Sequence, residues 1–115
     1  MVTTRTYGYA DLARKTAVRA DTVFELGSLS KQFTAMAVLM LVEEGKVSLD
    51  ASIATYLPDV PEPWRPITVR HLLNHTSGIR SYTSLGPKWQ RIMRLDLAPD
   101  SMVALFANEP FDFKP

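Results

Sequence analysis

The sequence predicts an α+β fold that is mostly helical, with a short antiparallel strand region near the N-terminus. Residues 33–42 are apolar on every side of a helix and are followed by two glutamates and a glycine, which indicates a buried helix with a glycine stop. Thr68 precedes a short apolar stretch, as an N-cap residue does. Residues 3–12 alternate loosely around two tyrosines and a glycine, a pattern typical of a strand.

The remaining elements follow in order along the chain. Residues 22–26 are predicted to be extended, and Ser28 then stands where a helix should begin. After the long helix, a loop with a short helical piece ends before Pro58, and four prolines predict an extended, helix-free connector. Three further helices are predicted: residues 69–75, stopped by Gly78; residues 88–95; and a last one, capped by Asp100 or Ser101, that runs to residue 107 or 108.

Composition narrows the class of protein. The chain has 115 residues, 46% hydrophobic and 22% charged, so one soluble globular domain of ordinary size is expected. A net charge of +1 gives no electrostatic reason to expect nucleic acid or a membrane surface as a partner. The absence of cysteine excludes a disulfide framework, a thiol nucleophile and a cysteine zinc site. The longest apolar run is too short to span a bilayer, and the first residues contain no signal-peptide core, which leaves the compartment open.

Ser28 and Lys31 are three positions apart, so they share one face of a helix. A serine hydroxyl becomes a good nucleophile when a base takes its proton, and a lysine amine serves as that base where burial or neighbouring cations lower its pKa. The start of a helix also presents free N–H groups, one of them that of Ser28, which stabilise a developing anion. The pattern leaves a second interpretation open, in which Ser28 caps the helix and Lys31 is a solvated side chain.

Three sequence blocks stand in a fixed order: Gly-Ser-x-Ser-Lys-x-Phe-Thr at 27–34, Glu-Gly-Lys-x-Ser-Leu-Asp at 44–50 and His-Leu-Leu-x-His-Thr-Ser-Gly at 71–78. Together with YGYADLA near the start and FDFKP at the end, they resemble the β-lactamase-like serine hydrolases. This family includes class C β-lactamases, D-alanyl-D-alanine carboxypeptidases and related esterases. The resemblance implies the serine β-lactamase and penicillin-binding-protein-like fold. It also implies acyl transfer on an ester, a β-lactam or a D-Ala-D-Ala-like amide, with no cofactor.

By this resemblance, Ser28 would be the acylated nucleophile and Lys31 its proton-transfer partner. The family's Tyr-x-Asn element and its Lys-Thr-Gly-like strand, which supplies the second oxyanion donor, have no counterpart in these residues. The helix and strand that usually precede YGYADLA have none either. Residues 1–115 are therefore expected to form a single partial domain of that fold, with weak activity or none by itself.

Three other residues are weighed as site residues. Tyr82 follows the His-Thr-Ser-Gly block in a loop, where it is a candidate substrate-binding residue or an ordinary surface tyrosine. His75 can act as an acid or a base, but capping or packing is the commoner role of such a histidine. His71 and His75 have the spacing of a metal-binding pair, yet no third ligand lies near them in the sequence, so no metal site is predicted.

The apolar helix also bears on partners. Each large apolar side chain left in water forgoes roughly 1.5–3 kcal/mol of burial. Residues 33–42 are therefore expected to be covered by a second copy of the chain or by a complementary fragment. A catalytically inert, self-associating fragment of the same fold is the alternative function, and an unrelated helical interaction module is a third.

Overall fold

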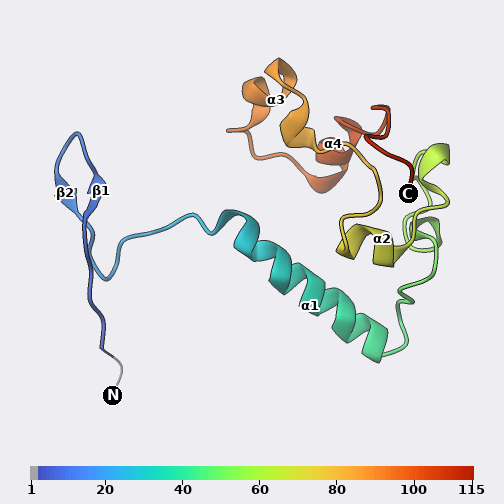
Figure 1. Ribbon diagram of the computed structural model, residues 1–115, viewed down its shortest axis with the longest axis horizontal. Helices are drawn as coiled ribbons and strands as arrows, with labels where there is room; N and C mark the ends of the chain where they lie inside the picture. The colour runs from blue at the N-terminus through green and yellow to red at the C-terminus, as the bar shows by residue number, and fades with distance from the viewer. Residues whose placement is uncertain (1–2) are drawn as a thin grey trace. The chain divides into compact units, whose positions relative to one another are not determined.

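A computed structural model describes residues 3–115 (Figure 1), and the chain divides into two units. The first unit ends at Thr34 and the second begins at Ala35, so the boundary falls inside the long helix.

The first unit contains a two-stranded antiparallel sheet. Strand β1 (Tyr9–Asp11) pairs with β2 (Thr16–Ala17), and the register shifts by a bulge between the two paired positions of β1. The predicted strand over residues 3–12 is therefore right in kind but longer than the strand that forms. Residues 22–26, predicted to be extended, belong to no strand. Lys15 has a positive φ of 53° in the turn before β2, which the alternation of apolar residues does not reveal.

The long helix begins with a 3₁₀ turn, η1 (Gly27–Leu29), and continues as α1 (Ser30–Glu43). Its C-terminal end has the predicted glycine stop. Gly45, with φ of 70°, donates its N–H to the carbonyl of Val42 at 2.9 Å, and Lys46 donates to that of Leu41 at 2.9 Å. This pair of hydrogen bonds is a Schellman motif, which satisfies carbonyls that the helix itself leaves free.

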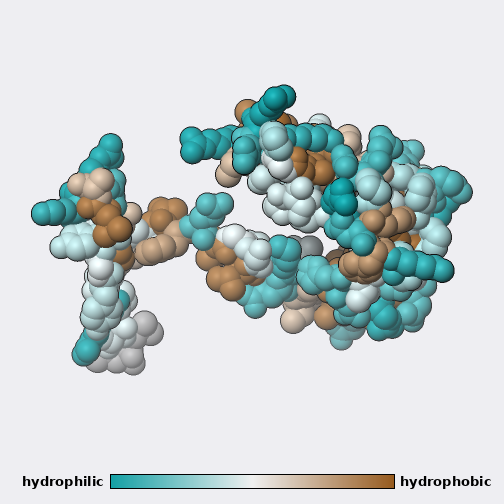
Figure 2. Space-filling view, turned by 45° about the horizontal axis from the view of Figure 1, so that its top comes forward, coloured by the Kyte–Doolittle hydropathy of each residue, from teal (hydrophilic) through white to brown (hydrophobic). Residues whose placement is uncertain are grey.

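The prediction that α1 is buried is wrong for the chain by itself, because none of its residues is buried. Hydrophobic side chains remain exposed along it, and brown patches mark such side chains on the molecular surface in Figure 2. Met36, for example, is 59% exposed. The physical reason is that residues 3–115 supply no element that covers all sides of this helix.

The core lies in the second unit and is small. Ile53, Trp64 and Ile67 are its buried hydrophobic residues, and Ile67 is 0% exposed. The ring of Trp64 stacks on that of Phe106, with the centroids 5.7 Å apart. Further partly buried side chains pack against this cluster: Val60, Val69, Ile79, Ala107 and Phe111.

Backbone hydrogen bonds tie residues 49–53 to residues 67–70 beside this core. Ile53 donates its N–H to the carbonyl of Ile67 at 2.9 Å, and Arg70 donates to that of Leu49 at 2.8 Å. The guanidinium of Arg70 also forms two hydrogen bonds with the carboxylate of Asp50, at 2.7 and 3.1 Å. The block at 44–50 is thereby joined to the residues directly before the block at 71–78.

Helix α2 (Val69–Leu73) begins at the predicted N-cap. The hydroxyl of Thr68 accepts the N–H of His71 at 3.2 Å, and Nδ1 of His71 accepts the N–H of Thr68 at 3.2 Å. Each group satisfies a backbone donor of the helix end, as in a capping box. The helix ends at Leu73, before the glycine that was expected to stop it.

The other helical elements are short: η2 (Ile53–Thr55), η3 (Glu62–Trp64), η4 (Tyr82–Ser84), α3 (Pro87–Ile92) and α4 (Pro99–Ala104). Element η2 is the short helical piece predicted before Pro58. Element η3 contradicts the prediction of a helix-free connector, since proline is well tolerated at the start of a helical turn. Helix α4 starts at Pro99, so neither Asp100 nor Ser101 is its cap.

A close contact fastens the end of the chain to the loop after α2. The N–H of Asp112 donates to the carbonyl of Gly78 at 2.8 Å, and Arg80 donates to the carboxylate of Asp112 at 2.8 Å. Gly78 has a φ of 68°, and a Cβ placed on it would lie 2.0 Å from the carbonyl oxygen of Phe113. Only glycine fits this approach.

The described residues are mostly helical with one two-stranded antiparallel sheet, which confirms the predicted fold class. None of the helices in residues 3–115 has the length and apolar character needed to cross a membrane.

Candidate functional site

Ser28 and Lys31 meet at the N-terminal end of the long helix. Ser28 lies in η1 and Lys31 in the first turn of α1, and Nζ of Lys31 donates a hydrogen bond to Oγ of Ser28 at 2.9 Å. The three-residue spacing thus brings the amine and the hydroxyl onto one face, as the sequence predicts. Both side chains are exposed to solvent.

Ser28 is not the N-cap of the helix, contrary to the interpretation that made it a capping residue. The residue at the cap position of η1 is Leu26, whose side chain accepts no hydrogen bond. The hydroxyl of Ser28 is therefore engaged by the lysine and not by a backbone N–H of its own helix. This leaves the oxygen beside the start of the helix, where N–H groups lack intrahelical acceptors.

The first turn of α1 contains no acidic residue, so no carboxylate competes with Ser28 for Lys31 from within the helix. The clearest pKa shift lies in the second unit, where the hydrogen bonds from Arg70 hold the pKa of Asp50 below its usual value. The same bonds raise the pKa of Arg70.

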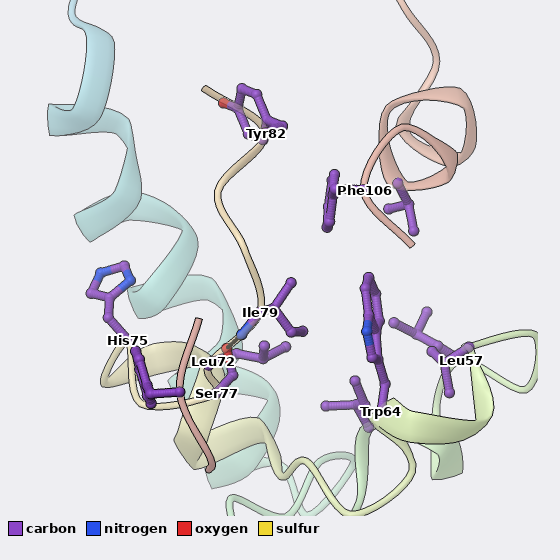
Figure 3. A pocket seen from close by; sticks show the side chains of 13 residues that line it. Leu57, Trp64, Leu72, His75, Ser77, Ile79, Tyr82 and Phe106 are labelled. Carbon is purple, nitrogen blue, oxygen red and sulfur yellow. Dashed lines mark hydrogen bonds between the residues drawn. The ribbon is translucent and has the colours of Figure 1, made fainter. Parts of the chain in front are cut away.

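Tyr82 lies in the second unit, at the first residue of η4. Its ring packs against Trp89, with the centroids 4.9 Å apart, and against Phe106, at 6.1 Å. Tyr82 also lines a hollow of about 480 Å³ whose walls are mostly apolar. Figure 3 shows Phe106 between Tyr82 and Trp64, and Ser77 beside Leu72 and Ile79. Tyr82 is 36% exposed, and its ring packs against two aromatic side chains from other elements.

The two histidines have different environments. His71 uses Nδ1 in the cap of α2, a role that its spacing to His75 does not suggest. His75 has a positive φ of 57° just after the helix and lines the hollow. Within residues 3–115, no three histidine, aspartate or glutamate side chains gather closely enough to hold a metal ion.

The sequence did not indicate that Ser77 is buried. It is only 8% exposed, it lines the hollow, and its Oγ accepts the N–H of Ile79 at 3.3 Å. The sequence offers no local signal for this burial, because the segment that closely approaches the neighbouring Gly78 is the distant Phe113.

Comparison with known proteins decides the family. Residues 1–115 match the family described as Beta-lactamase. The chain belongs to this family. It is 41% identical to penicillin-binding protein 4* of Bacillus subtilis over 66% of its length, and 42% identical to esterase EstB of Burkholderia gladioli over 65%. It is also 39% identical to a β-lactamase of Escherichia coli over 64% of its length.

These matches cover 16% of the penicillin-binding protein and 20% of the esterase and of the β-lactamase, so the chain spans about a fifth of the length of these relatives. No solved structure matches the chain significantly. The described residues are therefore a region of the β-lactamase fold from a family of serine hydrolases. The family resemblance inferred from the three blocks is confirmed.

Proposed function

We propose that Ser28 is the nucleophile of a serine hydrolase that works by acyl transfer, with Lys31 as its proton-transfer partner. The observation that supports this most is the 2.9 Å hydrogen bond between Nζ of Lys31 and Oγ of Ser28. A general base must lie within about 2.6–3.2 Å of the atom whose proton it takes. The pair meets that requirement without any rearrangement of the helix.

The chemical step follows from this geometry. The hydroxyl proton of Ser28 passes to Nζ of Lys31 as Oγ forms a bond to the carbonyl carbon of the substrate. The bond from that carbon to its leaving group then breaks, and the leaving group receives the proton that Nζ of Lys31 took up. An acyl group is left on Oγ, and water releases it as an acid in a second step. N–H groups at the start of the helix favour the oxyanion that forms between these steps.

The substrate we propose is a small ester, a β-lactam or a D-Ala-D-Ala-like amide. The names of the relatives support this range, since they are a penicillin-binding protein, an esterase and a β-lactamase. We assign Tyr82 as a substrate-binding residue, because its ring lines an apolar hollow with neighbours that fix its position. Residues 1–115 are part of one β-lactamase-like domain in this proposal.

Labelling of the chain with a fluorophosphonate or with a penicillin tests the nucleophile. Intact-mass spectrometry of the wild-type chain is expected to show one adduct, and Ser28→Ala should abolish it. Ser30→Ala is the matched control, because Ser30 is a serine two positions further on, in the same turn, and is expected to label like the wild type. An adduct that survives in Ser28→Ala contradicts the proposal, and a folded wild-type chain that takes no label at all supports the inert fragment instead.

A second candidate is a catalytically inert piece of the same fold that associates with a copy of itself or with a complementary fragment. The exposed apolar side chains of α1 favour it, because a large apolar surface in contact with water is stabilised when a partner covers it. Sedimentation velocity at micromolar concentration tests it. Association without labelling of Ser28 supports the inert fragment, and a stable monomer rules it out.

A further inference from the structure

We infer that the hollow in the second unit is a binding site for a small, mostly hydrophobic ring compound that carries one hydrogen-bond acceptor. The inference stands whether or not Ser28 reacts, since every residue that lines the hollow belongs to the second unit. It extends the role proposed for Tyr82, which lines the hollow, by naming the chemistry of the ligand that the hollow takes.

The size and the aromatic lining of the hollow fit a small, flat molecule. Its volume of about 480 Å³ falls within the range of about 300–1,000 Å³ that small-molecule sites occupy. Trp64 and Phe106 stack at an interplanar angle of 22° and form one aromatic wall. Aromatic faces and edges favour a planar ring offset against them, so a flat ligand suits this wall best.

Ser77 supplies a hydrogen-bond donor in the lining of the hollow. This serine is 8% exposed and lines the hollow, and Figure 3 shows it among Leu72 and Ile79. Its Oγ accepts the N–H of Ile79, but within residues 3–115 its hydroxyl proton has no acceptor. A buried hydroxyl with a free proton favours a ligand that offers a carbonyl oxygen at that point.

The segments that line the hollow are held in place by contacts within the second unit. Gly78 and Ile79 are fixed by the hydrogen bond from Asp112 to Gly78 and by the ion pair of Arg80 with Asp112. Trp64, which also lines the hollow, is itself a buried residue of the core. The site is therefore built on segments that are tied to each other, and a ligand would not have to order them.

Titration with indanone and with indane, followed by ligand-observed NMR, tests the inference. The two probes share one bicyclic skeleton and differ in the carbonyl. Indanone is expected to bind saturably with a dissociation constant on the order of 1 mM or below. It should bind roughly fivefold more tightly than indane, as one neutral hydrogen bond of about 1 kcal/mol provides. Ser77→Ala is expected to remove that difference and leave the binding of indane unchanged.

Two variants keep the test decisive if Ser77→Ala destabilises the chain. Val103 lines the hollow and is 39% exposed, so Val103→Phe should fill the space and abolish binding of both probes. Met40→Phe, on α1 and outside the lining, should bind both probes like the wild type. The absence of saturable binding, or equal loss in the two phenylalanine variants, overturns the inference. So does an affinity that falls as protein concentration rises, since a second copy would then occupy the hollow.

Discussion

Helix α1 and the core around Ile67 are both rich in hydrophobic residues, but they differ in what surrounds them. Ile53, Trp64 and Ile67 come from three segments that backbone hydrogen bonds and the Asp50–Arg70 pair draw together. Residues 30–43 form a regular helix with a well-made C-terminal end, yet none of them is buried. Local sequence sets where the helix ends, whereas burial requires partners from elsewhere in the chain.

The largest expected effect is a direct test of this contrast. Ile67→Ala removes a fully buried side chain and is expected to cost about 2–5 kcal/mol, enough to unfold a unit with so small a core. Met36→Ala, on exposed α1, should change the free energy of unfolding by about 0.5 kcal/mol or less. Urea denaturation followed by circular dichroism measures both. Equal losses in the two variants would show that α1 is packed and that the contrast is wrong.

Two glycines with the same backbone conformation sharpen the comparison next. Gly78→Ala is expected to cost more than about 2 kcal/mol, because a Cβ would collide with the backbone of Phe113. Gly45→Ala, at the end of α1, meets no atom within 4 Å and should cost only about 1 kcal/mol for its positive φ. Thermal unfolding of the two variants checks this order. A larger loss at Gly45 would contradict the placement of the chain end against Gly78.

Self-association is the third test, since it asks what covers α1. Replacement of an exposed helix residue by a polar one, Leu39→Gln, is expected to weaken self-association about tenfold or more, as loss of one buried leucine contact would. The control Leu95→Gln alters a leucine of similar exposure outside the helix and should leave association unchanged. Sedimentation equilibrium gives both dissociation constants. If both variants weaken association alike, α1 is not the contact surface.

The smallest effect is the acid dependence of the Asp50–Arg70 pair. Because its hydrogen bonds to Arg70 lower the pKa of folded Asp50, the pair stabilises the fold above the ordinary carboxyl value of 3.8 and loses this contribution as pH falls through the lower, folded value. Wild type should therefore be more stable than Asp50→Asn near neutral pH, and the gap should close in acid. Asp59→Asn is the control, since within residues 3–115 that carboxylate forms no ion pair. A gap independent of pH would contradict the role of this ion pair.

The sequence was most informative where a local signal decides the structure. The glycine stop after α1, the cap at Thr68 and the spacing of Ser28 and Lys31 are all set within a few residues. It was least informative where distant parts of the chain decide. The exposure of α1 depends on which elements are present to cover it, and the close approach of Gly78, next to the buried Ser77, to Phe113 depends on a segment far along the chain.

The site followed the same rule. The blocks of the sequence indicated the family, and the pairing of Ser28 with Lys31 needed only the helical spacing. The position of Tyr82 against Trp89 and Phe106 could not be predicted, because these rings come from separate elements. The 3₁₀ turn that places Ser28 before α1, where a capping role was also open, could not be read from a serine alone.

The rate at which a fluorophosphonate adds to Ser28, measured by intact mass in wild type and in Lys31→Met, tests the central claim most directly. Loss of the proton acceptor is expected to slow addition about a hundredfold or more. Lys15→Met, which removes a lysine of the hairpin turn, should react at the wild-type rate. Equal rates in wild type and Lys31→Met would mean that the hydrogen bond between these side chains has no part in catalysis.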